Sequence, residues 1–438
     1  MFTIHARSRD GIASDEDRGS RDRGPTSSIR YCRMCLVCDT MRPLSVKTPN
    51  ESHRDWQTLP RGDMHNNHSQ PDLKSVHQTA LRWLVSSHVR GADGAYRSIY
   101  KPRTREYEDF YPGDSCLGVT AGAVVTLERA GYPDLALQSA GHIRGLLIEK
   151  NRDWAGALPT GRNSQHFLPN FMMFGVLALL HAHRKNRDDG FLQAAARAGT
   201  FVMDKMQLTD GSFYQMLGRK RHYRLLTRHL LPRHTMHAAC IPAFLELCTA
   251  TGEARFRSAA LRFADWLCRQ QRPDGSFPLE RHTPLSKVAV GLRNRDLSEI
   301  VRGGLRAHPA AHTYSIQGLM LLGRIEEARR AAQWLSQQLG PNGLLYQFYY
   351  PDGTHSIEED VMPTAHLGLL VLEYPELGLD KALPATIAEG VAYAQIRSED
   401  PDAHGALRGL PLHPIRGDQA YAWDTIFGIE LLHRILPT

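Results

Sequence analysis

Side chains that could carry out acid–base chemistry gather in six segments of this chain, each lying just before an apolar helical stretch. Cleaving a glycosidic bond typically needs two carboxylates, one with a pKa high enough to donate a proton. Epimerisation or β-elimination at a uronate needs instead a base near C5 and cations that neutralise the sugar carboxylate. Four carboxylates are the predicted catalytic groups. They are Asp114, Glu359, Asp360 and Asp424.

Three of these carboxylates also have a purely structural interpretation. Asp424 lies inside an apolar helical stretch, where a carboxylate needs a partner, so it is either functional or half of a buried ion pair. Asp114 stands where a helix N-cap belongs. Glu359, next to Glu358, could belong to a solvated loop face, because such charges are seldom buried.

The predicted substrate-binding residues form an aromatic side and a largely basic side. Aromatic rings can stack on sugar faces, while histidine and arginine can hold an anion. His166 and His312, which open helical stretches, could equally be structural histidines. The aromatic side adjoins the carboxylates and consists of Tyr111, Tyr350, Tyr421 and Trp423. The other side consists of His166, Asn170, His234, Arg293, His312 and Tyr314. Basic residues are dense around this second side, between residues 219–237 and 281–312.

A divergent repeat must position these groups. It is marked by a glycine, then a small or apolar residue, then an aromatic residue or leucine, as in Gly275-Ser276-Phe277. Successive glycines are 62, 55, 64, 68 and 62 residues apart. They are Gly94, Gly156, Gly211, Gly275, Gly343 and Gly405.

Each glycine separates two kinds of helix. The stretch before it has apolar residues at i, i+3 and i+4, which predicts a helix with one buried face. The stretch after it is apolar all round, which predicts a helix buried on several sides. These second helices are expected near residues 114–130, 168–184, 234–250, 310–323, 363–374 and 418–436.

Twelve helices in six hairpins predict an all-α fold, an (α/α)6 toroid, because a closed ring leaves no hairpin face uncovered. An open α-solenoid is the alternative, but its unit is usually shorter and its last repeat is an atypical cap. Here the last helix is as apolar as the others. The long loops all fall at one end, with short β-hairpin-like pieces, so the site is expected there, over the N-termini of the inner helices.

This pattern resembles the six-hairpin toroid enzymes, which include six-hairpin glycosidases, N-acylglucosamine 2-epimerase-like proteins and D-glucuronyl C5-epimerases. The resemblance covers residues 72–438 and implies the toroid fold and a carbohydrate substrate. A weaker resemblance joins Gln271–Phe277 to the repeat of squalene and terpene cyclases, which have tryptophan where this chain has Phe277. The acidic D-x-D-D motif of those cyclases is absent from the sequence.

Composition limits the remaining possibilities. The chain has 438 residues, 42% of them apolar and 23% charged, which is typical of a globular protein. No apolar run approaches the ~20 residues of a membrane span and no secretory signal is visible, so a cytoplasmic location is expected. Residues 1–70 show no hydrophobic period and are expected to be disordered or a wrongly assigned extension, with 71–438 forming one toroid domain.

The charged residues and the cysteines give weaker indications of the partners and cofactors of this protein. The net charge is +7, and only nine of the 53 Lys and Arg residues are lysine, which weakly favours an anionic partner. A nucleic acid is not expected, because no nucleic-acid fold motif accompanies the basic segments. Cys32, Cys35 and Cys38 lack a nearby fourth ligand, so neither a metal nor a cofactor is expected.

The sequence thus predicts a carbohydrate-active enzyme that hydrolyses or epimerises an acidic oligo- or polysaccharide with paired carboxylates. Two alternatives stay open. One is a cyclase-like toroid, which would need an apolar, aromatic-lined cavity. The other is a non-catalytic glycan-binding protein, which would lack two carboxylates within ~10 Å of each other.

Overall fold

The computed structural model describes residues 71–108, 116–219, 231–285, 287, 305–413 and 416–436. The chain divides into two units, Met1–Glu51 and Ser52–Thr438, and every described residue belongs to the second. Residues 1–70, with the three closely spaced cysteines, lie outside the described part, so the predictions made for them stay predictions.

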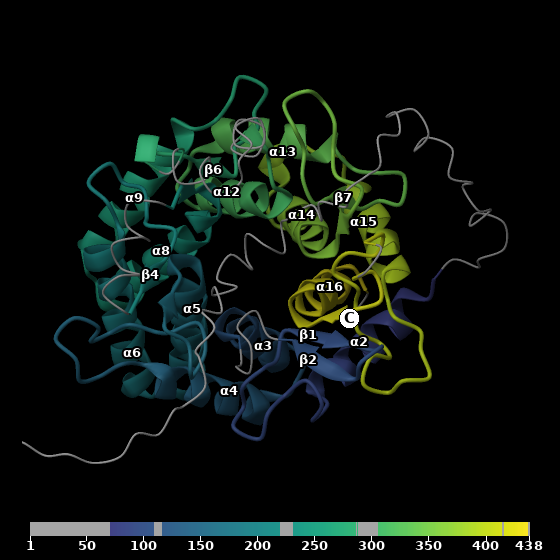
Figure 1. Cartoon of the computed structure of the whole chain (residues 1–438), viewed down its shortest axis with the longest axis horizontal. Coiled ribbons are helices and arrows are strands. Elements are labelled where there is room, and N and C mark those ends of the chain that lie inside the picture. Colours follow the sequence, from purple (N-terminus) through teal and green to yellow (C-terminus); the bar gives the residue numbers. More distant parts are fainter. Residues whose placement is uncertain are drawn as a thin grey trace, which may run out of the picture. The chain divides into compact units, whose positions relative to one another are not determined.

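Twelve α-helices form six hairpins among these residues, each pairing an outer helix with an inner one (Figure 1). This arrangement confirms the predicted all-α toroid. The outer helices are α2 (Leu73–Val85), α4 (Pro133–Leu146), α6 (Asp189–Phe201), α9 (Ala254–Cys268), α13 (Ile325–Ser336) and α15 (Leu383–Tyr393). The inner helices are α3 (Leu117–Arg129), α5 (Pro169–Asn186), α8 (Cys240–Thr251), α12 (Pro309–Leu321), α14 (Val361–Glu373) and α16 (Ala422–Ile435).

The ring closes between the two ends of the described chain. Each inner helix contacts the next, and α16 contacts both α2 and α3. Near the seam, the Trp83 indole N–H donates to the Asp402 carbonyl (2.8 Å), and Thr126 donates to Glu430 (2.7 Å). The open α-solenoid is therefore excluded, because its first and last repeats would not touch.

The repeat glycines set the spacing between neighbouring hairpins. Gly156 has φ 91°, and a Cβ built on it would lie 2.7 Å from the Arg197 carbonyl oxygen on the next outer helix. Gly405 has φ 93°, and its Cβ would lie 2.6 Å from the carbonyl oxygen of Thr79 on α2, the first outer helix. Only glycine fits such an approach. Four further glycines approach the next outer helix in the same way: Gly94, Gly211, Gly275 and Gly343.

A glutamine at the end of several outer helices reinforces these contacts. The Gln395 amide donates to the carbonyl oxygens of Gly405 (3.1 Å) and of Val76 on α2 (2.9 Å). Gln271 likewise bridges its own turn glycine and the following outer helix. In these repeats the glutamine side chain thus joins the turn to the next outer helix through two backbone carbonyl groups.

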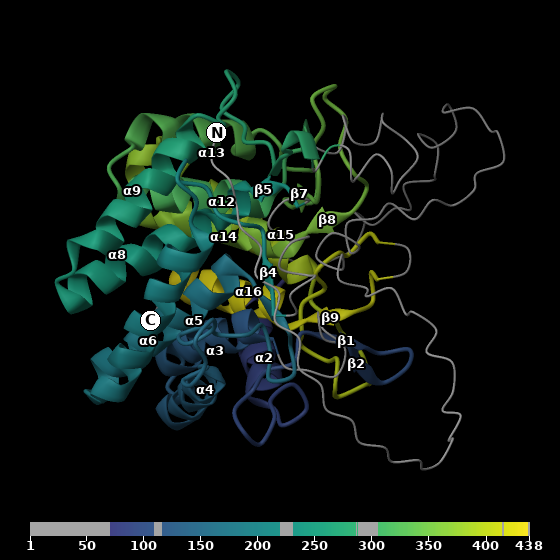
Figure 2. The same ribbon diagram turned by 60° about the vertical axis from the view of Figure 1, so that its left-hand side comes forward.

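Short strands gather at one end of the ring, beside the N-termini of the inner helices (Figure 2). They form one three-stranded sheet, with strands in the order β2-β1-β9, and three two-stranded sheets. The strands of these sheets are β1 (Ile99–Lys101), β2 (Glu106–Glu108), β9 (Ala420–Tyr421), β3 (His166–Phe167), β4 (Leu217–Gly218), β5 (Arg233–His234), β6 (Glu280–Arg281), β7 (Leu345–Tyr346) and β8 (Glu359–Asp360).

Several of these strands pair loops of neighbouring hairpins, which the sequence did not predict. Strand β3 pairs β4 and β5 pairs β6 across consecutive repeats, while β9 pairs β1 across the seam. Because the segment before α16 is held extended in β9, this helix begins at Ala422 instead of near residue 418. For a similar reason α8 begins at Cys240, after β5 and the 3-10 helix η3 (Thr235–Ala239).

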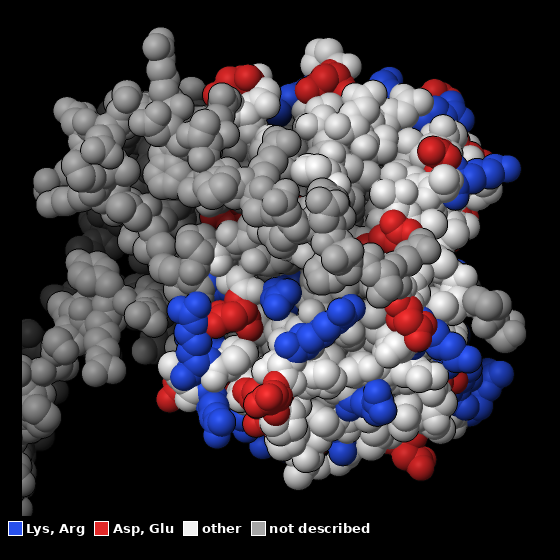
Figure 3. All heavy atoms as spheres, turned by 90° about the vertical axis from the view of Figure 1, so that its right-hand side faces the viewer, with Lys and Arg blue, Asp and Glu red and all other residues white. Residues whose placement is uncertain are grey.

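The surface carries charges of both signs. On the described part of the face shown in Figure 3, acidic and basic side chains are interspersed. Within the described ranges, no helix combines the length and apolarity that crossing a bilayer requires.

We predict that Gly405→Ala destabilises the protein by about 3 kcal/mol, because the new Cβ adds a backbone collision to the strain of a positive φ. Gly131→Ala is the matched control: its φ is 86°, but nothing lies within 4 Å of the added Cβ. The control should cost only about 1 kcal/mol. Chemical denaturation measures both, and equal costs would contradict the role given to the close approach.

Candidate acid–base site

Asp360 and Asp424 meet at the N-terminus of helix α14. Asp360 ends strand β8 and is the N-cap residue of α14, while Asp424 lies in the first turn of α16. The Met362 backbone N–H donates to Asp424 Oδ1 (2.9 Å) and also favours the ionised form of Asp360. The two carboxyl groups are therefore direct neighbours, although 64 residues separate them in the sequence.

Their surroundings oppose ionisation of both groups. Burial raises the pKa of Asp424 above its usual range, and the Met362 N–H only partly offsets this. Burial also raises the pKa of Asp360, and the negative charge of Asp424 acts in the same direction. When two adjacent carboxyls both resist ionisation, one of them can hold a proton while the other accepts one.

Aromatic side chains from inner helices surround the pair. The Tyr314 ring lies 5.5 Å from the Phe174 ring, and the Trp423 ring lies 5.1 Å from Phe174. Burial raises the pKa of the Tyr314 hydroxyl; a contact with Trp423 opposes the shift, whereas the charges of Asp424 and Asp360 increase it. Among the predicted binding residues that the structure describes, Tyr314 and Trp423 lie beside the pair.

A basic cluster lies in the loops before α8 and α12. It is organised around a carboxylate that the sequence analysis missed. Glu280 on β6 lies 3.2 Å from His234 Nε2, 3.0 Å from His282 Nε2 and 3.7 Å from an Arg306 nitrogen. Burial alone would raise the pKa of Glu280, but hydrogen bonds from His234 and His282 hold it well below its usual range. The predicted residue His234 thus belongs to a network, with the Gln215 amide 3.0 Å from its Nε2.

Glu359 lies apart from the acid pair. Successive residues of a strand point to opposite faces, so Glu359 and Asp360 on β8 face different ways. The Glu359 carboxylate is fully buried and accepts a hydrogen bond from the Asn342 amide (2.9 Å). Burial raises its pKa. The interpretation of Glu359 as part of a solvated loop face is wrong, because the exposed fraction of this residue is 0%.

His312 is held inside the protein by both ring nitrogens. Its Nε2 accepts from the Phe277 backbone N–H (2.8 Å), and its Nδ1 lies 3.1 Å from the His308 carbonyl oxygen, to which it donates. The ring stacks on Trp334 at a centroid distance of 4.6 Å. Neither nitrogen is left for a substrate, so the structural interpretation of His312 fits this geometry.

The other predicted binding residues are dispersed. His166 on β3 is buried, which lowers its pKa to about 4, and Asn170 is buried in the first turn of α5. The hydroxyl of Tyr421, the residue before α16, donates to the Gln419 amide oxygen (3.1 Å). Tyr350 lies in the turn that follows Phe348. Three predicted residues lie outside the described ranges: Tyr111, Asp114 and Arg293.

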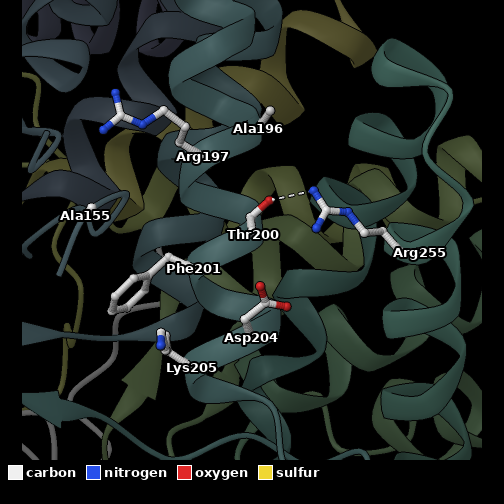
Figure 4. A pocket seen from close by; sticks show the side chains of 8 residues that line it. All are labelled: Ala155, Ala196, Arg197, Thr200, Phe201, Asp204, Lys205 and Arg255. Carbon is white, nitrogen blue, oxygen red and sulfur yellow. Dashed lines mark hydrogen bonds between the residues drawn. The ribbon is translucent and has the colours of Figure 1, made fainter. Parts of the chain in front are cut away.

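A separate pocket lies on the outer side of the ring, between α6 and α9 (Figure 4). Its cations already hold parts of the protein together. Arg255 donates to the Thr200 hydroxyl (3.1 Å) and pairs with Glu253 (2.6 Å), and Arg197 donates to the Glu149 carbonyl (3.1 Å). None of the predicted site residues lines it. Its lining residues are Ala155, Ala196, Arg197, Thr200, Phe201, Asp204, Lys205 and Arg255.

The described residues contain no group of three or more His, Cys, Asp or Glu side chains arranged to hold a metal ion.

Solved structures of sugar-active enzymes have the same fold. A sugar epimerase from a ruminal bacterium matches with a TM-score of 0.61 and 14% identity, covering 84% of this chain and 100% of that chain. The unsaturated glucuronyl hydrolase from Bacillus sp. GL1, responsible for the degradation of glycosaminoglycan, matches with a TM-score of 0.59 and 15% identity, covering 82% and 96%. A cellobiose 2-epimerase from Bacillus thermoamylovorans matches with a TM-score of 0.59 and 10% identity, covering 83% and 99%.

These likenesses establish the fold. The chain has the (α/α)6 architecture of the six-hairpin glycosidase-like proteins, as its repeat predicts. No protein-family model matches the sequence, and no curated protein matches it either.

We predict that Asp424→Asn stabilises the folded protein at pH 8. A carboxyl whose folded pKa is raised contributes most to stability below its unfolded pKa, and that contribution is lost as the pH rises through the folded value. Asparagine avoids this loss, and its amide oxygen can still accept the Met362 N–H. The variant should exceed the wild type by about 2 kcal/mol at pH 8 and by much less at pH 4.

Chemical denaturation across this pH range measures the difference. Asp265→Asn is the control, because Asp265 forms a surface ion pair with Arg324. Its difference from the wild type should stay within about 0.5 kcal/mol at every pH. A constant difference for Asp424→Asn as well would contradict the electrostatics described for the pair.

Proposed function

We propose that this chain is a carbohydrate-active enzyme that acts on an acidic, uronate-containing oligo- or polysaccharide, by hydrolysis or epimerisation, through Asp360 and Asp424. The observation that carries the proposal is the buried carboxyl pair at the N-terminus of α14, with the pKa of both members raised. Burying two such groups together weakens a protein, which favours a functional reason for keeping them.

The environments of the two carboxyls suggest different roles. Burial and the negative charge of Asp424 both raise the pKa of Asp360, so Asp360 is suited to hold a proton and act as the general acid. Asp424 is anchored as an acceptor by the Met362 N–H and is suited to be the carboxylate that acts as base or nucleophile. In hydrolysis the acid protonates the glycosidic oxygen, whereas in epimerisation the base removes a proton from a sugar carbon.

Two further observations support an acidic sugar as substrate. In the cluster around Glu280, Arg306 supplies a positive charge that could balance a sugar carboxylate, and His234 and His282 supply ring N–H groups. Of the three solved structures described above, one is an unsaturated glucuronyl hydrolase, one is a sugar epimerase and one is a cellobiose 2-epimerase. Tyr314 and Trp423 offer rings against which a sugar can pack.

The pair also bears on the two alternatives. A non-catalytic glycan-binding protein has no need of neighbouring carboxyls with raised pKa values, so their presence favours an enzyme. A cyclase-like toroid stays an alternative that the ligand experiment below addresses.

We predict that Asp424→Asn and Asp360→Asn each lower turnover by 100-fold or more, because each removes one half of the acid–base pair. The probes are 4-nitrophenyl β-D-glucuronide, the matching glucoside and an unsaturated glucuronyl disaccharide. Epimerisation is followed by NMR as solvent deuterium entering a glucuronate oligosaccharide. The glucuronide should be favoured over the glucoside.

Glu359→Gln is the matched control, because Glu359 is the neighbouring buried carboxylate on the other face of β8. It should retain turnover within a few-fold. A thermal-shift panel of uronate glycans, neutral glycans and polyprenyl diphosphates gives a second measurement. Stabilisation by prenyl diphosphates alone, or full turnover in both aspartate variants, would refute the proposal.

A further inference from the structure

An extended segment places His308 beside the acid pair. The Ala307 N–H donates to the Tyr349 carbonyl (2.8 Å), and the Tyr349 N–H donates back to the Ala307 carbonyl (3.0 Å). This pairing keeps the segment extended, so Arg306 and His308 lie on the same face. Both pack on Phe348: the Arg306 guanidinium lies 4.3 Å from the ring centroid, and the His308 ring lies 5.2 Å away, edge to face.

The backbone determines which nitrogen of His308 carries the proton. His308 is the N-cap residue of α12, and its Nδ1 accepts from the Ala310 N–H (3.1 Å). A backbone N–H can only donate, so Nδ1 is unprotonated and Nε2 carries the hydrogen. Burial, together with the charges of Arg306, His312 and His234, lowers the pKa of His308 to about 3. The ring therefore stays neutral.

The Nε2–H group of His308 lies near the Asp360 carboxyl without forming a hydrogen bond to it. His308 Nε2 lies 3.9 Å from Asp360 Oδ2, beyond hydrogen-bond distance. One further oxygen can contact both groups, because a point to the side of the line joining the two atoms can lie about 2.8 Å from each of them. Such an oxygen would be within reach of a proton on Asp360 and would also accept from His308.

We propose that His308 is a further catalytic residue of the acid–base site: its neutral Nε2–H donates a hydrogen bond to the sugar oxygen that Asp360 also contacts. The inference rests on the proposed function and adds to it a fixed donor that the acid–base pair lacks.

The donor stabilises negative charge that develops on the bridging oxygen as the reaction proceeds. A neutral, preoriented donor suits this task, because it stabilises the charge without itself transferring a proton. The shape of the site supports the role. Phe348 holds the ring from one side and the Ala310 N–H fixes its angle, so the donor needs no rearrangement when the substrate binds.

Two substitutions separate this role from helix capping. His308→Asn keeps a good N-cap, since the asparagine oxygen can take the place of Nδ1, but its side chain is too short to reach the bridging position. His308→Gln places an amide N–H near the position of Nε2 but caps poorly. We expect His308→Asn to keep the wild-type Tm and lose about 100-fold in turnover of the glucuronide and disaccharide probes. His308→Gln should have a lower Tm and recover at least tenfold over His308→Asn.

The outcomes distinguish this inference from the function on which it rests. Full turnover in His308→Asn, alongside loss in Asp424→Asn, would overturn the role of His308 alone. Full turnover in both Asp424→Asn and Asp360→Asn would overturn the proposed function. Nitrogen NMR of the full-length protein is independent of any substrate: a neutral His308 ring with its hydrogen on Nε2 at neutral pH is expected. A ring that is protonated on Nδ1 overturns the inference.

Discussion

The ring depends on the close approach of each turn glycine to the backbone of the next outer helix. At this contact a side chain would collide with a carbonyl oxygen, so the distance between neighbouring hairpins is set by backbone atoms. The contact at Gly405 is made with Thr79, which joins the last repeat to the first. Because six hairpins are spaced in this way, the last inner helix lies between α14 and α3. That placement brings Asp424 to the N-terminus of α14.

Burying Asp360 and Asp424 together lowers the stability of the folded protein. Two buried carboxyls repel each other and lose hydration, and what offsets this is the Met362 N–H together with the positive end of the α14 dipole. The basic cluster around Glu280 is organised in the opposite way, since hydrogen bonds from two histidines keep that carboxylate ionised. The two sides therefore differ in electrostatics: ionisation is opposed at Asp360 and Asp424 and favoured at Glu280. His308 lies between the two groups, near both Arg306 and Asp360.

Part of this site could be predicted from residue types, and part could not. Asp424 was indicated by being a carboxylate inside an apolar helix, and Asp360 by its place just before one. Glu359 has the same local signals as Asp360, but alternation along a two-residue strand turns it away, and so short a strand leaves no readable period. Glu280 had only one signal, its position two residues before His282 in a basic segment, and was missed. His312 lies at a helix start, as a ligand would, yet both of its nitrogens are used within the fold.

The sequence by itself determined the twelve helices, their inner or outer position and the end of the ring where chemistry could occur. Hydrophobic period and glycine spacing are local properties, so they can be read without knowing which parts of the chain meet. Only the tertiary structure decided which carboxyls became partners. Asp360 and Asp424 belong to different hairpins, and their meeting depends on ring closure and on the rotation of α14 and α16 about their axes. Those are set by packing across the whole ring, to which residues far from the site contribute.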